Sequence, residues 1–66
     1  MTVQELKPGD QFKLNGQRRF RTLTRSIDLD SKNLSNYIQK PGHILLIYDG
    51  CYQLVLEKAV PVKEKR

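Results

Sequence analysis

Ile44-Leu45-Leu46-Ile47-Tyr48-Asp49-Gly50-Cys51-Tyr52-Gln53-Leu54-Val55-Leu56 is the stretch that decides the fold of this chain. Two apolar runs flank an Asp-Gly pair, which is the strongest short-range signal of a β-hairpin. We therefore expect two antiparallel strands joined by a two-residue turn at Asp49-Gly50.

The expected hairpin has two apolar faces. A two-residue turn places Tyr48 opposite Cys51 and Ile47 opposite Tyr52, and successive side chains alternate between the faces. One face then holds Leu45, Ile47, Tyr52, Leu54 and Leu56. The other face holds Ile44, Leu46, Tyr48, Cys51 and Val55. A surface hairpin needs only one apolar face, so the same chain covers the second face, or that face binds a protein partner or a second copy.

Turn signals divide the rest of the chain into short strands. Pro-Gly or Asn-Gly pairs stand at 8–9, 15–16 and 41–42, which predicts strands over 11–14, from 17 to about 26, and over 59–62. Segment 28–40 is polar and allows at most one helical turn within 31–40. The pattern predicts an all-β domain over 1–62, a small SH3-like or OB-like barrel of about five strands, and a basic tail at 63–66.

The register of the first hairpin follows from burial. A tight turn at Asn15-Gly16 would place Arg19 opposite Phe12, whereas one extra residue places Phe20 there instead. We therefore expect the bulged version, with Arg19 and Arg21 facing outward. Strict alternation then leaves Leu23 on the outer face unless a further bulge intervenes.

Length and composition narrow the class of protein. The chain has 66 residues, of which 38% are hydrophobic, so it forms one domain with a small core that a dimer interface would enlarge. A single cysteine excludes an internal disulfide and favours the cytoplasm. The sequence shows neither a signal peptide nor an apolar run of membrane-spanning length, so we expect no membrane association.

Positive charge is concentrated in one segment. Of the net charge of +5, residues 17–25 contribute Arg18, Arg19, Arg21 and Arg25 with no acidic residue. Together with Lys13, these arginines predict a surface for RNA or DNA, because a basic stripe binds phosphates. Three tyrosines, at 37, 48 and 52, are the candidates for stacking on bases. The alternative is a solvated edge strand that charge keeps soluble.

Catalysis has little support. His43 and Cys51 are the only histidine and cysteine, and the expected register places them at opposite ends of the hairpin. They are too few to form a tetrahedral zinc site, and no glycine-rich phosphate loop is present. We therefore expect no enzyme activity, no metal and no cofactor.

The segment Leu6-Lys7-Pro8-Gly9-Asp10-Gln11-Phe12-Lys13-Leu14-Asn15-Gly16 resembles the start of KOW-like, SH3-type barrels, such as the N-terminal domain of elongation factor P. There a turn leads to an alternating strand, a glycine turn and a second strand that an aromatic residue enters, here Phe20. The resemblance covers about residues 6–23 and implies a barrel, but it assigns no functional residue. The whole chain also looks like short uncharacterised bacterial or phage proteins, which implies no activity.

These observations predict a small basic module without catalytic activity. Its first expected function is nucleic-acid binding through the arginine-rich strand. The alternative is a protein-binding or self-associating module that uses the second face of the hairpin.

Overall fold

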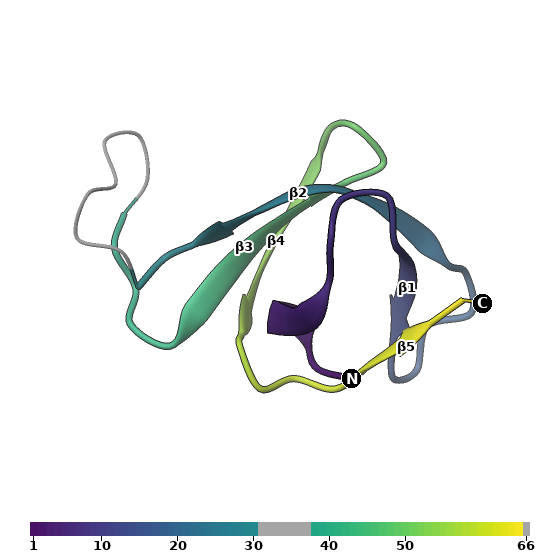
Figure 1. The fold of residues 1–66 in the computed structure, drawn as a ribbon, viewed down its shortest axis with the longest axis horizontal. Coiled ribbons are helices and arrows are strands. Elements are labelled where there is room, and N and C mark those ends of the chain that lie inside the picture. Colours follow the sequence, from purple (N-terminus) through teal and green to yellow (C-terminus); the bar gives the residue numbers. More distant parts are fainter. Residues whose placement is uncertain (31–37, 66) are drawn as a thin grey trace.

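The fold is a single antiparallel β-sheet. The computed structural model describes residues 1–30 and 38–65. It contains the 3-10 helix η1 (Val3–Glu5) and the strands β1 (Gln11–Leu14), β2 (Arg21–Asp28), β3 (His43–Tyr48), β4 (Tyr52–Glu57) and β5 (Val62–Glu64). The strand order is β4-β3-β2-β1-β5 (Figure 1). The expected all-β class is confirmed, while the helical turn allowed within 31–40 falls largely on residues 31–37, which lie outside the described residues.

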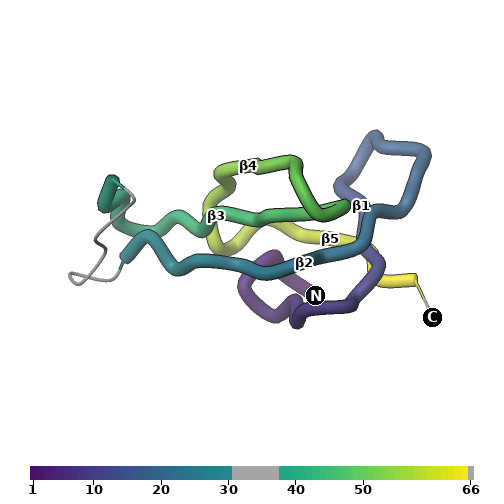
Figure 2. Tube along the Cα trace, turned by 90° about the horizontal axis from the view of Figure 1, so that it is seen from above, coloured from purple at the N-terminus to yellow at the C-terminus, as the bar shows by residue number. Residues whose placement is uncertain are grey.

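The sheet curves around η1, and the N-terminal segment lies beside the segment that leads into β5 (Figures 1 and 2). The Val3 N–H donates to the Val60 carbonyl at 2.9 Å, and the Val62 N–H donates to the Met1 carbonyl at 3.0 Å. β5 begins at Val62, the last residue of the expected closing strand, and pairs with β1. Residues 63 and 64, expected in the tail, therefore form part of the sheet.

The β3–β4 hairpin has a different register from the expected one. Tyr48 pairs with Tyr52, and Leu46 pairs with Leu54, so three residues rather than two form the turn. Asp49 in that turn has a φ of 51° and Gly50 a φ of 81°, which are left-handed conformations suited to these residue types. The one-residue shift exchanges the faces of every β4 side chain relative to β3.

The shift separates the five residues expected at a partner interface. Ile44 and Leu46 are buried in the main core, and Tyr48 packs against the same core. Cys51 is exposed in the turn, and Val55 lies on the opposite face of the sheet, where it pairs with Leu45. The prediction that these five side chains share one face is therefore wrong.

The β1–β2 register also differs, because Phe12 pairs with Arg21 rather than with Phe20. β2 begins only at Arg21, so Phe20 lies in the connection before the strand. Arg21 shares the face of Phe12 instead of pointing away from it, and the expected outward stripe of Arg19 and Arg21 does not form. Leu23 follows Arg21 on this inner face and is buried.

A β-bulge divides β2. Leu23 pairs with Tyr48 and Arg25 pairs with Ile47, so Thr24 is the extra residue on the β2 side. Leu23 and Arg25 would share a face in a regular strand, but the bulge places them on opposite faces. Arg25 therefore lies on the other face of the sheet from Arg21.

Buried side chains form two clusters on the two faces of the sheet. The main core lies between η1 and the sheet, and its buried members are Val3, Leu6, Phe12, Leu23, Ile44, Leu46 and Val62. The second cluster contains Leu29, Leu45 and Ile47, with Ile27 packed against them. The expectation that the hairpin carries two apolar faces is thus confirmed, although its residues are assigned differently.

Candidate functional site

The turn between β3 and β4 is fixed against β2 by three hydrogen bonds. The Asp49 N–H donates to the Thr22 carbonyl at 2.9 Å, and the Thr22 N–H donates to Oδ1 of Asp49 at 3.1 Å. The Gly50 N–H donates to Oγ1 of Thr24 at 2.9 Å. These bonds hold the start of β4 beside the start of β2, although about 27 residues separate the two segments in the sequence.

A cleft lies where these segments meet. Its volume is about 200 Å³, and it is lined by Arg19, Phe20, Arg21, Asp49 and Tyr52. We call these five residues the aromatic cleft. Phe20 is 38% exposed and Tyr52 is 56% exposed, so two aromatic rings are accessible at this site.

Ring contacts connect the aromatic cleft to the core. Tyr52 stacks on Tyr48 with the ring centroids 5.6 Å apart and an interplanar angle of 21°. Tyr48 meets the ring of Phe12 edge-on at 6.3 Å, and Phe12 is buried. Such ring pairs each stabilise the fold by about 0.5–1.5 kcal/mol beyond the burial of apolar area. The Tyr52 ring is therefore held in place by Tyr48, which in turn contacts the buried Phe12.

Cations surround the aromatic rings. The Arg21 guanidinium lies 4.8 Å from the centroid of the Tyr48 ring. The ammonium groups of Lys13 and Lys65 lie 5.0 Å and 5.9 Å from the centroid of Phe20. These distances are those of cation–π contacts, which attract the cations and orient them at the site.

Arg21 has an unusual environment for a charged side chain. It is half-buried, and its Nε is fully buried without a hydrogen-bond partner among the described residues. A buried donor without a partner costs about 1–3 kcal/mol, so native structures contain few of them. The contact with Tyr48 partly compensates for this cost and keeps the guanidinium at the cleft.

The structure assembles part of the predicted nucleic-acid set. Arg19 and Arg21 line the aromatic cleft, and Lys13 adjoins it through Phe20. Arg18 is exposed outside the cleft lining, and Arg25 lies beyond the bulge on the opposite face.

Sequence reasoning missed three residues of the site. Phe20 is expected opposite Phe12, and its exposure follows from the pairing of Phe12 with Arg21, which no local signal predicts. Asp49 was read only as a turn residue, and Lys65 only as part of a tail. Tyr52, which is a predicted stacking candidate although the expected hairpin register places it on an apolar face, is exposed.

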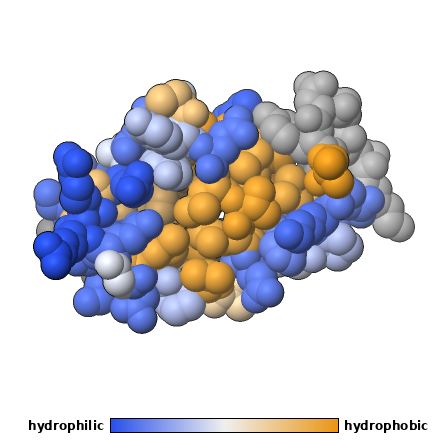
Figure 3. Space-filling view, turned by 180° about the vertical axis from the view of Figure 1, so that it is seen from behind, coloured by the Kyte–Doolittle hydropathy of each residue, from blue (hydrophilic) through white to orange (hydrophobic). Residues whose placement is uncertain are grey.

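The opposite face of the sheet shows a different character. Figure 3, the view from behind, shows hydrophobic surface in the middle of that side of the molecule with hydrophilic residues around it. On the sheet face that carries the second apolar cluster, Val55 is 42% exposed, while Leu45 and Ile47 on β3 are buried. This face carries the second apolar cluster and is the alternative candidate site.

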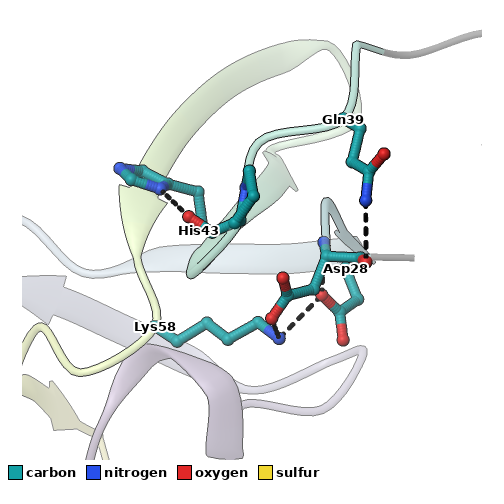
Figure 4. A network of polar contacts seen from close by, with 6 residues as sticks. Asp28, Gln39, His43 and Lys58 are labelled. Carbon is teal, nitrogen blue, oxygen red and sulfur yellow. Dashed lines mark hydrogen bonds and ion pairs between the residues drawn. The ribbon is translucent and has the colours of Figure 1, made fainter. Parts of the chain in front are cut away.

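A polar cluster joins the far ends of β2 and β4. Nζ of Lys58 lies 2.8 Å from Oδ1 of Asp28 and 3.0 Å from Oδ2 of Asp30 (Figure 4). The hydrogen bond from Lys58 lowers the pKa of Asp28, and the Asp30 N–H, which also donates to Asp28, lowers it further. The hydrogen bond to Asp28 in turn raises the pKa of Lys58. In this arrangement Lys58 forms ion pairs with both aspartates and connects the end of β4 to the end of β2.

His43 and Cys51 do not meet. His43 begins β3, where its Nδ1 lies 2.9 Å from the Pro41 carbonyl oxygen, and Cys51 follows the other end of that strand.

Within residues 1–30 and 38–65, no group of three or more histidine, cysteine, aspartate and glutamate side chains has a metal-binding arrangement. No helix in the same residues has the length and apolar character required to cross a membrane.

A second hollow, of about 210 Å³, is lined by Asn15, Pro61, Val62 and Lys63. Its lining has one cation and no aromatic ring, whereas the aromatic cleft has two cations, two aromatic rings and a carboxylate.

Comparisons of the chain with protein-family models, with curated proteins and with solved structures found no match. The function must therefore be inferred from the side chains themselves.

Proposed function

We propose that this protein is a small non-catalytic module that binds single-stranded RNA or DNA at the aromatic cleft. The observation that carries the proposal is the meeting of two exposed aromatic rings, Phe20 and Tyr52, with two arginines, Arg19 and Arg21, in one cleft. Proteins bind single strands by stacking bases on aromatic rings while cations contact the phosphates.

Three further features support this proposal. Lys13 and Lys65 add positive charge beside Phe20, which extends the basic surface beyond the cleft. The stacked pair of Tyr48 and Tyr52 is held by the core, so a base would meet a ring that is already ordered. An acidic peptide would also be attracted by the arginines, but it would not use a flat exposed ring as a base does.

A charge reversal tests the electrostatic part of the proposal. Arg19→Glu should weaken binding of a fluorescent 12-nucleotide oligonucleotide by about tenfold or more, because a charge-assisted hydrogen bond contributes about 1.5–3 kcal/mol. Lys40→Glu changes the net charge equally at an exposed position near the other end of β2 and should have little effect. Fluorescence anisotropy at low salt measures both. Absence of binding by the unmodified protein, or equal loss in both variants, would overturn the proposal.

A second pair of variants tests stacking. Tyr52→Phe keeps the ring and should keep the affinity, whereas Tyr52→Ala should reduce it by about 5- to 150-fold, the range expected for one stacked base. Thermal melting of both variants separates loss of stacking from loss of folding. Equal affinities of the folded Ala and Phe variants would exclude Tyr52 from the site.

The second candidate function is a protein-binding or self-associating module. The exposed Val55 beside the second apolar cluster favours it, because exposed apolar side chains next to an apolar cluster are typical of interfaces. Val55→Asp should then change the elution volume in size-exclusion chromatography if the chain self-associates.

The proposal also includes an SH3-like barrel fold and a cytoplasmic location. An SH3-like barrel is supported by the curved five-stranded antiparallel sheet. A cytoplasmic location is supported by the single cysteine, Cys51, which is exposed and would persist as a free thiol in a reducing compartment.

A further inference from the structure

The aromatic cleft contains one carboxylate, that of Asp49. A carboxylate repels phosphate groups, so its presence among Arg19 and Arg21 is unexpected if the cleft contacts only a nucleic-acid backbone. The edges of bases, in contrast, carry N–H groups, which can donate hydrogen bonds to a carboxylate. The Asp49 carboxylate, which also accepts a hydrogen bond from the Thr22 N–H, would therefore suit a base edge better than a phosphate.

The carboxylate is held in place but is not neutralised. Its Oδ1 accepts one hydrogen bond, from the Thr22 N–H at 3.1 Å. The ion pairs within 4.0 Å found in the described part of the chain are those of Lys58 with Asp28 and Asp30, so Asp49 makes none with Arg19 or Arg21. An ionised carboxylate has about four acceptor positions, which leaves both oxygens able to accept further hydrogen bonds.

Guanine is the base that matches this acceptor. Its Watson–Crick edge presents two adjacent donors, N1–H and the N2 amino group, which fit the two oxygens of one carboxylate. Adenine and cytosine place a lone pair beside their amino group, and thymine and uracil have one N–H between two carbonyl oxygens. Each of these edges would bring an acceptor against the Asp49 carboxylate.

We propose that the aromatic cleft prefers guanine, with Asp49 accepting from N1–H and N2–H while the base stacks on an exposed ring. This inference rests on the proposed single-strand binding. The volume of about 200 Å³ agrees with it, because the site is smaller than the roughly 300–1,000 Å³ of pockets for drug-sized ligands and suits a single base.

The test uses four 12-nucleotide DNA probes in which every fourth base of a thymine strand is replaced by guanine, adenine, cytosine or hypoxanthine, so that no probe is self-complementary, and a fifth of thymine alone. Anisotropy should show about 5- to 150-fold tighter binding of the guanine probe than of the adenine probe, the range for one bidentate contact. Hypoxanthine keeps N1–H and lacks the N2 amino group, so its probe should bind with intermediate affinity.

Asp49→Asn is the matched variant. Asparagine tolerates the φ of 51° at this position, and its single side-chain oxygen can still accept from the Thr22 N–H. The variant should lose most of the guanine preference, so the affinities for the guanine and thymine probes should become similar. A guanine preference that persists in Asp49→Asn would overturn the assignment to Asp49.

The remaining outcomes separate the two proposals. If all five probes bind equally and Arg19→Glu weakens all of them, the guanine preference is wrong and single-strand binding stands. If no probe binds even at low salt, single-strand binding is wrong and the guanine preference falls with it.

Discussion

Lys58 connects two strands that lie far apart in the sequence. Its ammonium group contacts Asp28 at the end of β2 and Asp30 just beyond, while Lys58 itself follows β4. The side chain of Lys58 is only 22% exposed, whereas both aspartates are well exposed. The contact thus ties the hairpin to β2 at the end of the sheet opposite the aromatic cleft.

This contact predicts a pH dependence of stability. The pKa of Asp28 is lowered in the folded state, so its contribution is present above the ordinary value of about 3.9 and is lost as the pH falls through the folded-state pKa. Lys58→Met keeps the apolar stem and removes the charge. Its melting temperature should lie below that of the unmodified protein at pH 7, and the difference should shrink at pH 3. A difference independent of pH would contradict the tie.

At the scale of single residues, the type of a side chain does not by itself determine whether that side chain is buried or exposed. Phe20 and Tyr52 are aromatic, and apolar residues usually belong in a small core, so both were expected there. Their exposure follows from two registers, Phe12 with Arg21 and Tyr48 with Tyr52. No property of either residue alone could have revealed it.

The β3–β4 hairpin is the element around which the fold is built. β3 is the central partner of both β2 and β4, and its four inner residues, 44–47, are all buried. The existence of the hairpin could be predicted from Asp49-Gly50 between apolar runs. Its register could not, because Cys51 adds a third residue to the turn, and two- and three-residue turns are both compatible with a glycine at this place.

The register predicts opposite outcomes for two similar substitutions. Leu46→Asp places a charge at a site with no exposure in the main core and should unfold the domain, because loss of a buried leucine alone costs about 2–5 kcal/mol, comparable with the total stability expected at this size. Val55→Asp, on the partly exposed outer face, should remain folded. Circular dichroism and thermal melting measure both. A folded Leu46→Asp variant would contradict the observed register.

The bulge in β2 separates Arg25 from the candidate site. By placing Thr24 out of register, it moves Arg25 to the face of Ile47 and leaves Arg21 beside Tyr48. Alternation along the sequence placed Arg19 and Arg21 on one outer face. The bulge lies close to the point where the pairing of β2 with β1 ends and its pairing with β3 begins, so it becomes visible only when the three strands are assembled.

At the scale of the whole molecule, the net charge of +5 acts through its distribution. Arg19 and Arg21 line the aromatic cleft, and Lys13 and Lys65 stand next to it beside Phe20. These cations come from β1, from the connection to β2, from β2 and from the C-terminal segment. The fold therefore gathers charge that the sequence spreads over more than 50 positions.

This distribution predicts a measurable salt dependence. For a single strand, the logarithm of the binding constant falls with the logarithm of the salt concentration with a slope of about −0.7 per phosphate neutralised. Two to four cations at the cleft give a slope between about −1.4 and about −2.8. Arg19→Gln should reduce its magnitude by about 0.7, whereas Lys40→Gln should leave it unchanged. A slope near zero would show that the charged groups do not contact phosphates.

The sequence by itself determined the all-β class, the hairpin and its two apolar faces, because turn residues and alternating apolar runs are local signals. It also identified Arg19 and Arg21 as candidate binding residues, since charge is visible without a structure. Only the tertiary structure decided which side chains share a face and that Phe20, Asp49 and Tyr52 meet these arginines. The physical reason is that a one-residue change in a turn or a bulge reverses the faces of a strand, and only packing across several strands selects among such registers.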